Sequence, residues 1–379
     1  MPVQPLKSVT AEDLHPSHAK RWTECPASVA MNATFDRGSS DIAREGSAAH
    51  KAAELILMGL ATSKSILGPV FHGHVITPEM VADIESYIET ATQVTKGPGV
   101  IKSGIEHKVP MFFGQTRVEG TADTWAVTPE ALSVYDLKYG FILVEARENR
   151  QLMLYAIGLL NLLTEWGISW PPVVRLGIDQ PRAYHTAGRS RWWQVNTAEL
   201  YEWWPFFVKK GKEALGPNPE FKSGPHCLYC DGMPHCKTSR LASMAALDVS
   251  GFAHLEELPP AALASELVFL QRAFQALKLR KESLEDHVTE LIQKGRHVPG
   301  FALDIGPGRR KWSASDEELK ALEELTGKKL FIEKPITLDA AKALIGKDLL
   351  AKYVTSRNTG HKLVTRDETA HAEALFGKP

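Results

Sequence analysis

Residues 118–140 read VEGTADTWAVTPEALSVYDLKYG and carry the most informative pattern in the chain. Apolar and polar residues alternate on both sides of the turn-forming VTPEA, so we expect two neighbouring strands of a sheet. Because side chains alternate along a strand, Asp136 and Lys138 project from the same face, and the adjoining strand can bring Asp123 beside them. The sequence therefore predicts a cluster of two acids and one lysine.

This predicted cluster suits a hard divalent cation. The two carboxylates, with the backbone carbonyl of Leu137, would supply the oxygen ligands that Mg²⁺ and Mn²⁺ prefer. A bound ion activates water, and Lys138 would orient that water and offset negative charge as it develops. Phosphodiester hydrolysis is the reaction that fits. Asp-x-Lys by itself is a weak signal, since solvent-facing Asp and Lys alternate on many edge strands.

The elements around these strands predict an α/β fold. Apolar residues at helical spacing indicate helices, and short alternating runs indicate strands. In chain order we expect a helix from about Ser47 to residue 60, a helix at 78–95, strands at 105–112, 117–127 and 132–138, a helix at 149–164, strands at 173–179 and 191–195, and a tryptophan-rich helix at 197–215.

The helix at 149–164 is apolar, yet it carries two polar residues one turn apart. Gln151 and Tyr155 stand at positions i and i+4 and therefore share one face of the helix. Taken singly, they are explained by a capping glutamine and by a buried tyrosine with a satisfied hydroxyl. As a pair that follows Asp-x-Lys, they indicate a shared role at the predicted cluster.

The segments GTAD, YDLKYG and QLMLY resemble, in order and spacing, the GxxD, (D/E)xK and QxxxY motifs of RecB-like PD-(D/E)XK nucleases. REGSAAH resembles the GxxxH motif that precedes them in that superfamily. The resemblance covers residues 15–240 and implies a nuclease core with a central mixed sheet flanked by helices.

The resemblance implies a role for each motif residue. The ligands of Mg²⁺ or Mn²⁺ would be His50, Asp123 and Asp136. Lys138 would be the catalytic lysine, and Gln151 with Tyr155 would contact the substrate or brace the site. His50 alone would equally fit a buried helix histidine.

Three further positions complete this comparison. Glu106 is a weaker candidate for an accessory acid, because a strand glutamate more often faces solvent. Ala122 stands where the superfamily name has proline, and Tyr139 follows the lysine where threonine is common. Neither position supplies a metal ligand, so the two departures leave the predicted catalysis intact.

All four cysteines belong to one layout. Cys25 lies in WTECPAS, and Cys227, Cys230 and Cys236 lie in CLYCDGMPHC. In a reducing cytosol, thiols indicate metal ligation or burial rather than disulfides. Four thiolates can hold tetrahedral Zn²⁺ or an iron-sulfur cluster, and spacing alone does not choose between them.

One distant cysteine with C-x2-C-x5-C resembles the 4Fe-4S clasp of AddB-type and CRISPR-associated RecB-like nucleases and of the single-strand exonucleases called Exo five. The resemblance implies a 4Fe-4S cluster on all four thiolates. Zn²⁺ stays an alternative, because His226 and His235 neighbour the cysteines. A centre that joins segments about two hundred residues apart would close a long loop, so its binding free energy would stabilise the fold.

Composition limits the other functions. Of 379 residues, 44% are hydrophobic, which suffices for a sizeable core. The 44 Lys and Arg residues balance 45 acids, so no global positive field marks a nucleic-acid partner, and any DNA affinity must be local. We see no bilayer-spanning apolar segment and no apolar signal region, so we expect no membrane partner and a cytoplasmic location.

The sequence changes character after Cys236, where strand signals give way to charged helical sequence. We place a domain boundary near 240–258, with a nuclease domain at 1–240 and a mainly helical region at 241–379. An apolar seam with four-three spacing marks one long helix there: Leu263, Leu267, Leu270, Phe274, Leu277, Leu284, Val288 and Leu291. This apolar seam can pack within its own chain or form a coiled-coil dimer.

Two groups outside the predicted cluster offer weaker DNA contacts. A basic group with a stacking ring consists of Arg309, Arg310, Lys311 and Trp312. A second group of rings consists of Trp192, Trp193, Trp203 and Trp204. A solvated turn and buried aromatics explain the same residues.

These features predict a metal-dependent DNA nuclease, an exonuclease more than an endonuclease, that acts on single strands or duplex ends. The C-terminal third resembles the tail of phage and prophage proteins, which implies phage-type recombination or replication in a bacterial cytoplasm, with a recombinase or single-strand-binding protein as candidate partner. A non-catalytic DNA-binding scaffold and a zinc-stapled structural protein stay open. Loss of an acid or of the lysine would mark the scaffold, and none is lost.

Overall fold

The computed structural model describes residues 5–250, 260–303 and 324. Its contacts divide the chain into two units, Met1–Leu303 and Asp304–Pro379. The change in sequence character after Cys236 therefore falls inside the first unit, to which all elements below belong.

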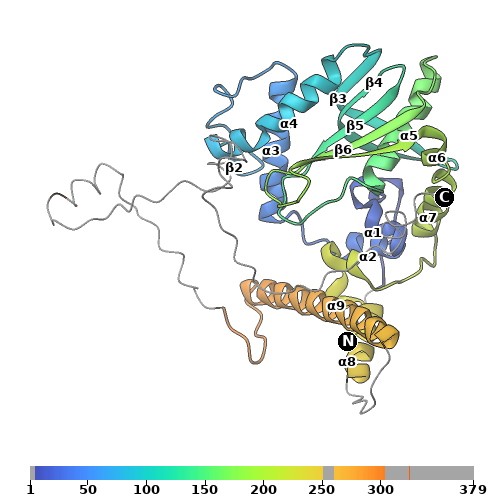
Figure 1. Cartoon of the computed structure of the whole chain (residues 1–379). Helices are drawn as coiled ribbons and strands as arrows, with labels where there is room; N and C mark the ends of the chain where they lie inside the picture. The colour runs from blue at the N-terminus through green and yellow to red at the C-terminus, as the bar shows by residue number, and fades with distance from the viewer. Residues whose placement is uncertain (1–4, 251–259, 304–323, 325–379) are drawn as a thin grey trace. The chain divides into compact units, whose positions relative to one another are not determined.

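A five-stranded mixed sheet lies at the centre of the first unit, in the order β3-β4-β5-β6-β7 (Figure 1). Its strands are Lys102–Phe113 (β3), Thr116–Val127 (β4), Ala131–Leu137 (β5), Val173–Asp179 (β6) and Ser190–Asn196 (β7). Strands β5 and β6 are parallel, and the other neighbouring pairs are antiparallel. A parallel pair requires a crossover, which helix α5 (Arg150–Glu165) supplies. The predicted α/β class is confirmed.

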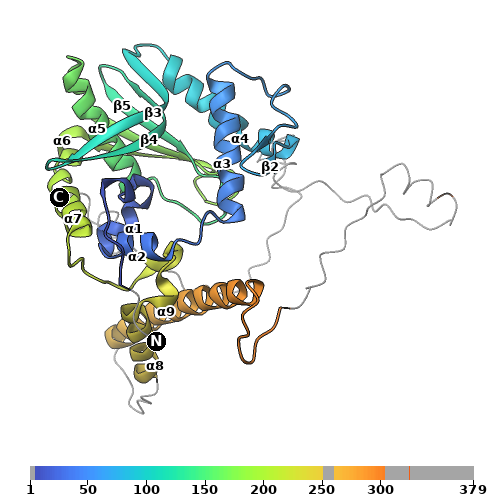
Figure 2. The same ribbon diagram turned by 180° about the vertical axis from the view of Figure 1, so that it is seen from behind.

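Helices cover both faces of this sheet (Figures 1 and 2). Helices α3 (Asp41–Leu57) and α4 (Pro78–Lys96) contribute to one buried apolar cluster, and α5 contributes to the other. Because side chains alternate along β5, Val134 belongs to the cluster on the α5 side, whereas Tyr135 and Leu137 belong to the α3–α4 side. Asp136 consequently faces α5.

The remaining elements are short, apart from the helices α7, α8 and α9. They are η1 (Ala11–Asp13), η2 (Pro16–His18), α1 (Ala19–Glu24), α2 (Ser28–Phe35), β1 (Val70–Phe71), β2 (His74–Val75), α6 (Thr197–Tyr201), α7 (Trp204–Leu215), η3 (Pro225–Tyr229), η4 (Met233–His235), α8 (Lys237–Ser250) and α9 (Pro260–Gln293). We call residues 19–35 and 220–236, which carry the cysteines, the cysteine lobe.

Two helices differ from their predicted bounds. Helix α3 begins at Asp41, earlier than predicted, because the Ala43 amide donates to the Ser40 hydroxyl at 3.2 Å and caps its first turn. The tryptophan-rich helix is two helices, α6 and α7, because Pro205 in the first turn of α7 begins a new helix.

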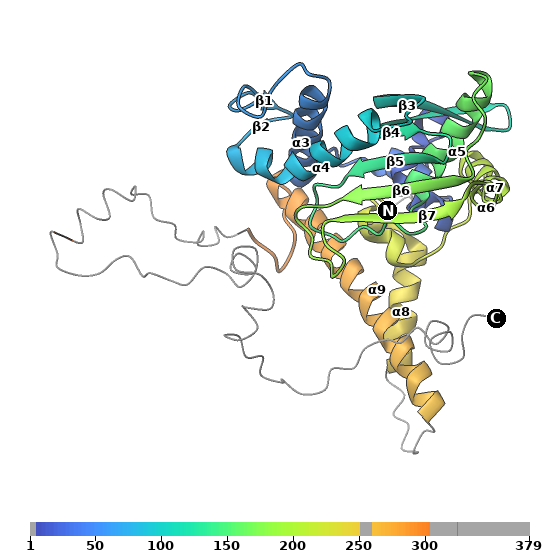
Figure 3. The same cartoon turned by 45° about the horizontal axis from the view of Figure 1, so that its top comes forward.

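Helices α8 and α9 lie side by side (Figure 3), and α9 also packs against the cysteine lobe. Leu279 is buried in one cluster with Cys227 and Met233. The Arg280 guanidinium donates to the carbonyl oxygens of Met233 and Pro234. The face of α9 that carries Leu279 therefore covers the lobe.

The apolar seam of α9 is not this buried face. Its side chains Leu267, Leu270, Phe274 and Leu284 are 40%, 42%, 68% and 39% exposed. Leu277, Val288 and Leu291 of the same seam are half-buried, and α9 packs against α8 and the cysteine lobe. Leu279, outside the four-three register, is the buried contact with that lobe, and the two interpretations of the seam both stay predictions.

Two predictions concern the chain beyond the sheet. In the part of the chain that the structure describes, no helix combines the length and hydropathy needed to cross a membrane. The basic group Arg309, Arg310, Lys311 and Trp312 lies outside the described residues.

Candidate active site

Three acids form a row across three adjacent strands. The pairing of β3 and β4 is interrupted at Glu106, which falls between the pairs Ile105–Thr124 and His107–Ala122 and so lies level with Asp123. The register of β4 and β5, continued by one residue, places Asp123 opposite Asp136. At Glu106 the backbone φ is 47°, a left-handed conformation that non-glycine residues rarely adopt. Such a backbone is costly and concentrates at functional sites.

His50 reaches this row from helix α3. Its Nδ1 lies 3.2 Å from Oδ2 of Asp123, and the same oxygen accepts a hydrogen bond from the Leu137 amide at 2.9 Å. One ligand atom each from His50, Glu106 and Asp123 lies within 4.8 Å of the others. Within the described residues, this is the one group of three such side chains that could hold a metal ion.

Asp136 and Lys138 form a second set of contacts, with helix α5. Lys138 Nζ lies 2.8 Å from Asp136 Oδ2 and donates to Gln151 Oε1 at 2.8 Å. Gln151 Nε2 donates to Asp136 Oδ1 at 3.2 Å and to the Tyr155 hydroxyl at 3.3 Å. The pair Gln151 and Tyr155 thus shares one face, as its spacing predicts, and holds the lysine in one place.

A glycine in β4 allows helix α5 to come this close. A Cβ atom at Gly120 would lie 2.6 Å from Cε1 of Tyr155 and 2.7 Å from Cγ of Pro16. Any side chain there would push the tyrosine ring or the N-terminal segment away from the strand. The glycine of GTAD therefore has a packing role.

The buried acids differ in proton affinity because their neighbours differ. Burial raises the pKa of Asp136 to about 6, although the Lys138 ammonium acts against it. Burial, together with the charge of Asp123, raises the pKa of Glu106 to about 7. Near neutral pH, Glu106 is therefore partly protonated.

Asp123 and His50 form the opposite case. Burial acts to raise the pKa of Asp123, but His50, Lys138 and the Leu137 amide outweigh it, so this pKa is lowered. Burial acts to lower the pKa of His50, but the Asp123 carboxylate outweighs it and raises this pKa to about 9. Without a metal ion, the two side chains form an ion pair at neutral pH.

The geometry differs from the predicted ligand set in one respect. Glu106, the weaker candidate, joins His50 and Asp123, whereas Asp136 lies outside that group and contacts Lys138. Nothing in a strand glutamate reveals that it faces a site, and only the pairing of β3 with β4 shows it. The carbonyl of Leu137 stays a predicted ligand.

This donor set fits a divalent cation such as Mg²⁺ or Mn²⁺. Carboxylate oxygens suit both ions, and imidazole nitrogen is a common ligand of transition metals. Oδ2 of Asp136 is buried and lies 2.8 Å from Lys138 Nζ, so the ammonium group supplies the positive charge beside this carboxylate.

The four cysteines line one small cavity in the cysteine lobe. Cys25 follows α1, and the other three lie in the segment of η3 and η4, where all four border a space of about 20 Å³. Among the described residues, no three of their sulfur atoms lie within 4.8 Å of one another. The thiols share a cavity without being drawn together.

Backbone amides point at two of these sulfur atoms. The Lys222 amide donates to Cys25 Sγ at 3.4 Å, and the Ser239 amide donates to Cys236 Sγ at 3.4 Å. Burial raises the pKa of Cys25, and it raises the pKa of Cys230 to about 12. These thiols therefore carry protons at neutral pH, and a bound metal centre would displace them.

The two neighbouring histidines have other contacts. His226 borders the cavity, and its Nε2 lies 2.8 Å from the carbonyl oxygen of Lys222. The His235 ring is stacked on Phe35, with a centroid distance of 4.2 Å, and does not border the cavity. His226 is therefore better placed than His235 to replace a thiolate.

One arginine connects the cysteine lobe to the row of acids. Arg150, at the first position of α5, donates to the Thr23 hydroxyl, and it pairs with Glu24 Oε1 at 2.6 Å. Glu24 precedes Cys25, and Arg150 precedes Gln151. The N-terminus of α5, the helix whose Gln151 contacts Lys138, is thus tied to the segment that carries Cys25.

A model of the family described as "Protein of unknown function (DUF2800)" matches residues 12–370. The chain belongs to the DUF2800 family. Among solved structures, it is similar to one described as the crystal structure of a "Putative exonuclease" from Eubacterium rectale. That similarity has 10% sequence identity and a TM-score of 0.37, and it covers 67% of this chain and 93% of that chain.

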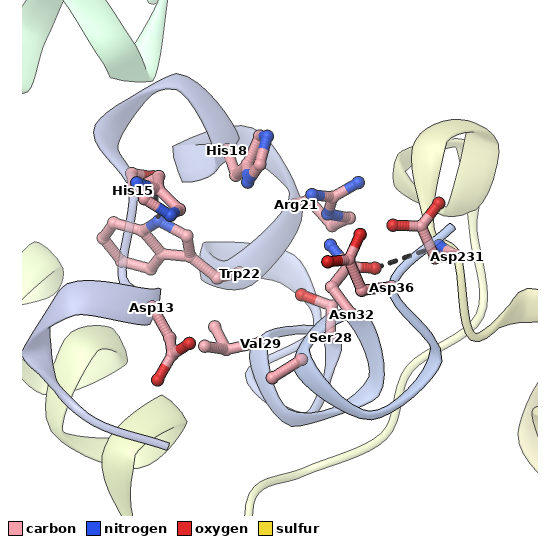
Figure 4. A pocket seen from close by; sticks show the side chains of 11 residues that line it. Asp13, His15, His18, Arg21, Trp22, Ser28, Val29, Asn32, Asp36 and Asp231 are labelled. Carbon is pink, nitrogen blue, oxygen red and sulfur yellow. Dashed lines mark hydrogen bonds between the residues drawn. The ribbon is translucent and has the colours of Figure 1, made fainter. Parts of the chain in front are cut away.

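The DUF2800 chain has a larger cavity, of about 220 Å³, that is lined mostly by residues of the cysteine lobe (Figure 4). Ser28 borders it with a buried hydroxyl that has no hydrogen-bond partner among the described residues. The Asp231 amide closes one side by donating to Asn32 Oδ1 at 3.0 Å. None of the three acids in the row borders this cavity, so it is separate from the candidate active site.

The tryptophans of this DUF2800 protein mostly support its core. Trp193, Trp203 and Trp204 are partly buried against the main apolar cluster. Trp192 is 42% exposed, but its ring is stacked on Tyr135 at 4.8 Å. These rings were interpreted either as DNA-stacking groups or as buried aromatics, and their contacts agree with burial.

Proposed function

We propose that this protein is a metal-dependent deoxyribonuclease of the RecB-like PD-(D/E)XK type. The observation that carries the proposal is the arrangement of His50, Glu106 and Asp123, whose ligand atoms lie within 4.8 Å of one another, next to an acid and lysine in contact. The activity is assigned to residues 1–240, and 241–379, of which most residues after 303 lie outside the described part of the chain, would have another role. An exonuclease is the expected type.

A divalent ion held by His50, Glu106 and Asp123, with Asp136 beside them, would supply a Lewis acid and an activated water. Lys138 is fixed between Asp136 and Gln151, so its ammonium stands where it can orient water and offset negative charge on a phosphate. Tyr155 restrains Gln151 through its hydroxyl, so it acts as a positioning residue.

We further propose that Cys25, Cys227, Cys230 and Cys236 hold a 4Fe-4S cluster. Tetrahedral Zn²⁺ with Zn–S bonds of about 2.3 Å places its sulfurs roughly 3.8 Å apart. No three of the thiols in the described chain lie within 4.8 Å of one another, so they are spread wider than one zinc ion requires. A four-iron cluster takes one thiolate at each of four corners, and the cavity that all four cysteines border supports such a shared centre.

Arg21 supports an anionic centre at this place. Its side chain is buried, borders the cavity and donates to the Tyr229 carbonyl. Burial lowers the pKa of Arg21, while the cysteines and Asp231 act to raise it. A cluster with four thiolates would bring net negative charge, which this buried guanidinium would offset.

The biological setting belongs to the same proposal. DNA, as single strands or duplex ends, would be the substrate, and phage-type recombination or replication would be the process. A recombinase or a single-strand-binding protein would then be the partner. A non-catalytic DNA-binding scaffold is the alternative that an absence of cleavage would favour.

The test is a nuclease assay on end-labelled single-stranded, duplex and circular DNA with Mg²⁺, Mn²⁺ or EDTA. We expect cleavage with either ion, none with EDTA, and little on circular DNA. DNA binding without cleavage under all ionic conditions would favour the scaffold. Iron and sulfide analysis of anaerobically purified protein tests the cluster, and zinc without iron would support the zinc-stapled alternative.

A further inference from the structure

The loop that follows the lysine exposes a run of large apolar side chains. Phe141, Ile142 and Leu143 are 56%, 49% and 41% exposed, directly after Lys138-Tyr139-Gly140. Tyr184, in the loop between β6 and β7, is 89% exposed. We call these four residues the apolar platform. Single exposed apolar residues are ordinary, but three in succession beside a polar site call for an occupant.

The buried side chain of Gln180 forms hydrogen bonds with the backbone of this loop. Gln180 Nε2 donates to the carbonyl oxygens of Gly140 and Ile142, at 2.9 and 2.8 Å. Its Oε1 accepts from the Val144 amide at 3.0 Å and from Arg191 at 3.0 Å. These bonds fix the loop backbone on both sides of Ile142. The exposed side chains are thus presented by a braced loop.

The platform lies next to the candidate active site. Strands β5 and β6 are parallel, so the loops that leave them emerge at the same edge of the sheet, just after Asp136 and Lys138. The Arg182 guanidinium lies 3.9 Å from the Phe141 ring centroid and pairs with Glu45 Oε2, in α3, at 2.6 Å. The β6–β7 loop runs beside α3 in both views of the ribbon (Figures 1 and 2).

The two loops are also joined to each other. His185 Nε2 lies 3.7 Å from Glu145 Oε1, which connects the loop of Tyr184 with the loop of Phe141. Arg147, farther along the latter loop, has a side chain that is 79% exposed, and its Nε lies 3.8 Å from Oε1 of the exposed Glu148. Apolar rings and an exposed cation therefore occur together at this edge. That combination suits a strand with a charged backbone and flat bases.

We propose that the apolar platform stacks against unpaired nucleobases of the strand whose phosphate lies at the candidate active site. This inference rests on the proposed function and adds the surface that selects the substrate. Bases inside a duplex cover each other's faces, so only an unpaired base can lie flat on Phe141 or Tyr184. The platform would therefore favour single-stranded or frayed DNA over paired DNA.

The test measures binding in EDTA, so that no strand is cut. A labelled single-stranded thymidine oligonucleotide is compared with an oligonucleotide of equal length whose central nucleotides lack bases. The wild-type protein should bind the first about tenfold more tightly or better. The double variant Phe141→Ala, Tyr184→Ala should bind both oligonucleotides as weakly as the wild type binds the one that lacks bases. Phe141→Trp should still prefer the oligonucleotide with bases.

Two further variants serve as controls. Phe112 is 45% exposed and lies six residues along β3 from Glu106, about 20 Å away, so Phe112→Ala should bind like wild type. Phe141→Leu keeps an apolar side chain without a flat ring, and it should lose most of the preference. Melting temperatures of all variants check that the fold persists.

Three results would overturn the inference. The first is equal affinity of the wild type for both oligonucleotides. The second is an unchanged preference in the double variant. The third is self-association of the wild type that Phe141→Ala abolishes, without any preference for bases, since the platform would then bind a second copy. If the protein cleaves DNA but binds the two oligonucleotides equally, only this inference is wrong. If it neither binds nor cleaves DNA, the proposed function is wrong too.

Discussion

The row of acids and the cysteine lobe are two candidate metal sites of different construction. The acids come from neighbouring strands, and the fold itself places His50, Glu106 and Asp123 within 4.8 Å of one another. The cysteines come from distant segments, and no three thiols in the described chain lie that close. Strand pairing can assemble a site before a ligand arrives, whereas a site that joins distant segments depends more on the ligand it binds.

The largest effect is expected at the preformed site. Asp136→Ala or Lys138→Ala should lower DNA cleavage by at least about a thousandfold, because these groups act on the reacting atoms. DNA binding in EDTA should change little, whereas the melting temperature should fall, because either change leaves the other member of the buried pair without its counter-charge. The control is Glu130→Gln, which removes an exposed acid from the turn between β4 and β5. Wild-type rates in the purified Asp136 or Lys138 variants would contradict the site.

The next effect is expected at the cysteine lobe. Cys25→Ala should lose as much iron as Cys230→Ala, because each thiolate caps one corner of a four-iron cluster. The melting temperature should fall by roughly 5 °C or more, with weaker cleavage although the acids are unchanged. Metal analysis and calorimetry provide the measurement. Full metal content in Cys25→Ala would show that Cys25 is not a ligand.

A smaller effect is expected where the two regions meet. Arg150→Ala removes the contacts with Thr23 and Glu24 and should lower kcat about tenfold, since the start of α5 positions Gln151 and Lys138. Iron content should stay near wild type. Loss of iron with unchanged kcat would show that Arg150 supports only the lobe. Lys222→Ala, which removes the other cation paired with Glu24, is the matched control.

The smallest effect concerns pH. Metal ligands must lose their protons, and the pKa values of Asp136, Glu106 and His50 are raised to about 6, 7 and 9. Mn²⁺ binding should therefore release protons and tighten as the pH rises from about 5.5 to about 8. Calorimetric titration in two buffers of different ionisation enthalpy measures the release. Affinity independent of pH would contradict the ligand set.

The same shifts affect the stability of the metal-free protein. A raised carboxyl pKa favours the folded state below the unfolded pKa, near 4, and this contribution is lost as the pH rises through about 6 for Asp136 and about 7 for Glu106. His50 contributes stability below its unfolded pKa that is lost as the pH rises through about 9. The lowered pKa of Asp123 contributes stability above its unfolded pKa, and this contribution is lost as the pH falls. Bound metal should offset the losses at higher pH.

The sequence predicted the sheet strands well because their signal is local. Alternation on both sides of VTPEA fixes β4 and β5 within a residue or two, and the spacing of Gln151 and Tyr155 places both on one face of α5. The apolar seam of α9 predicted the buried contact of that helix less well, for a physical reason. Periodicity shows that a helix has an apolar face, but it cannot show which face meets the rest of the protein, and Leu279 holds that contact.

By itself the sequence determined the α/β class, the pairing of Asp136 with Lys138 on one face, and the presence of four cysteines in one layout, because residue type and spacing along one element carry that information. Only the tertiary structure decided that Glu106 joins His50 and Asp123, that Arg150 ties α5 to the cysteine lobe, and that Gln180 braces the apolar platform. These contacts join residues from separate elements, and their geometry follows from the packing of those elements, which no local pattern in the chain specifies.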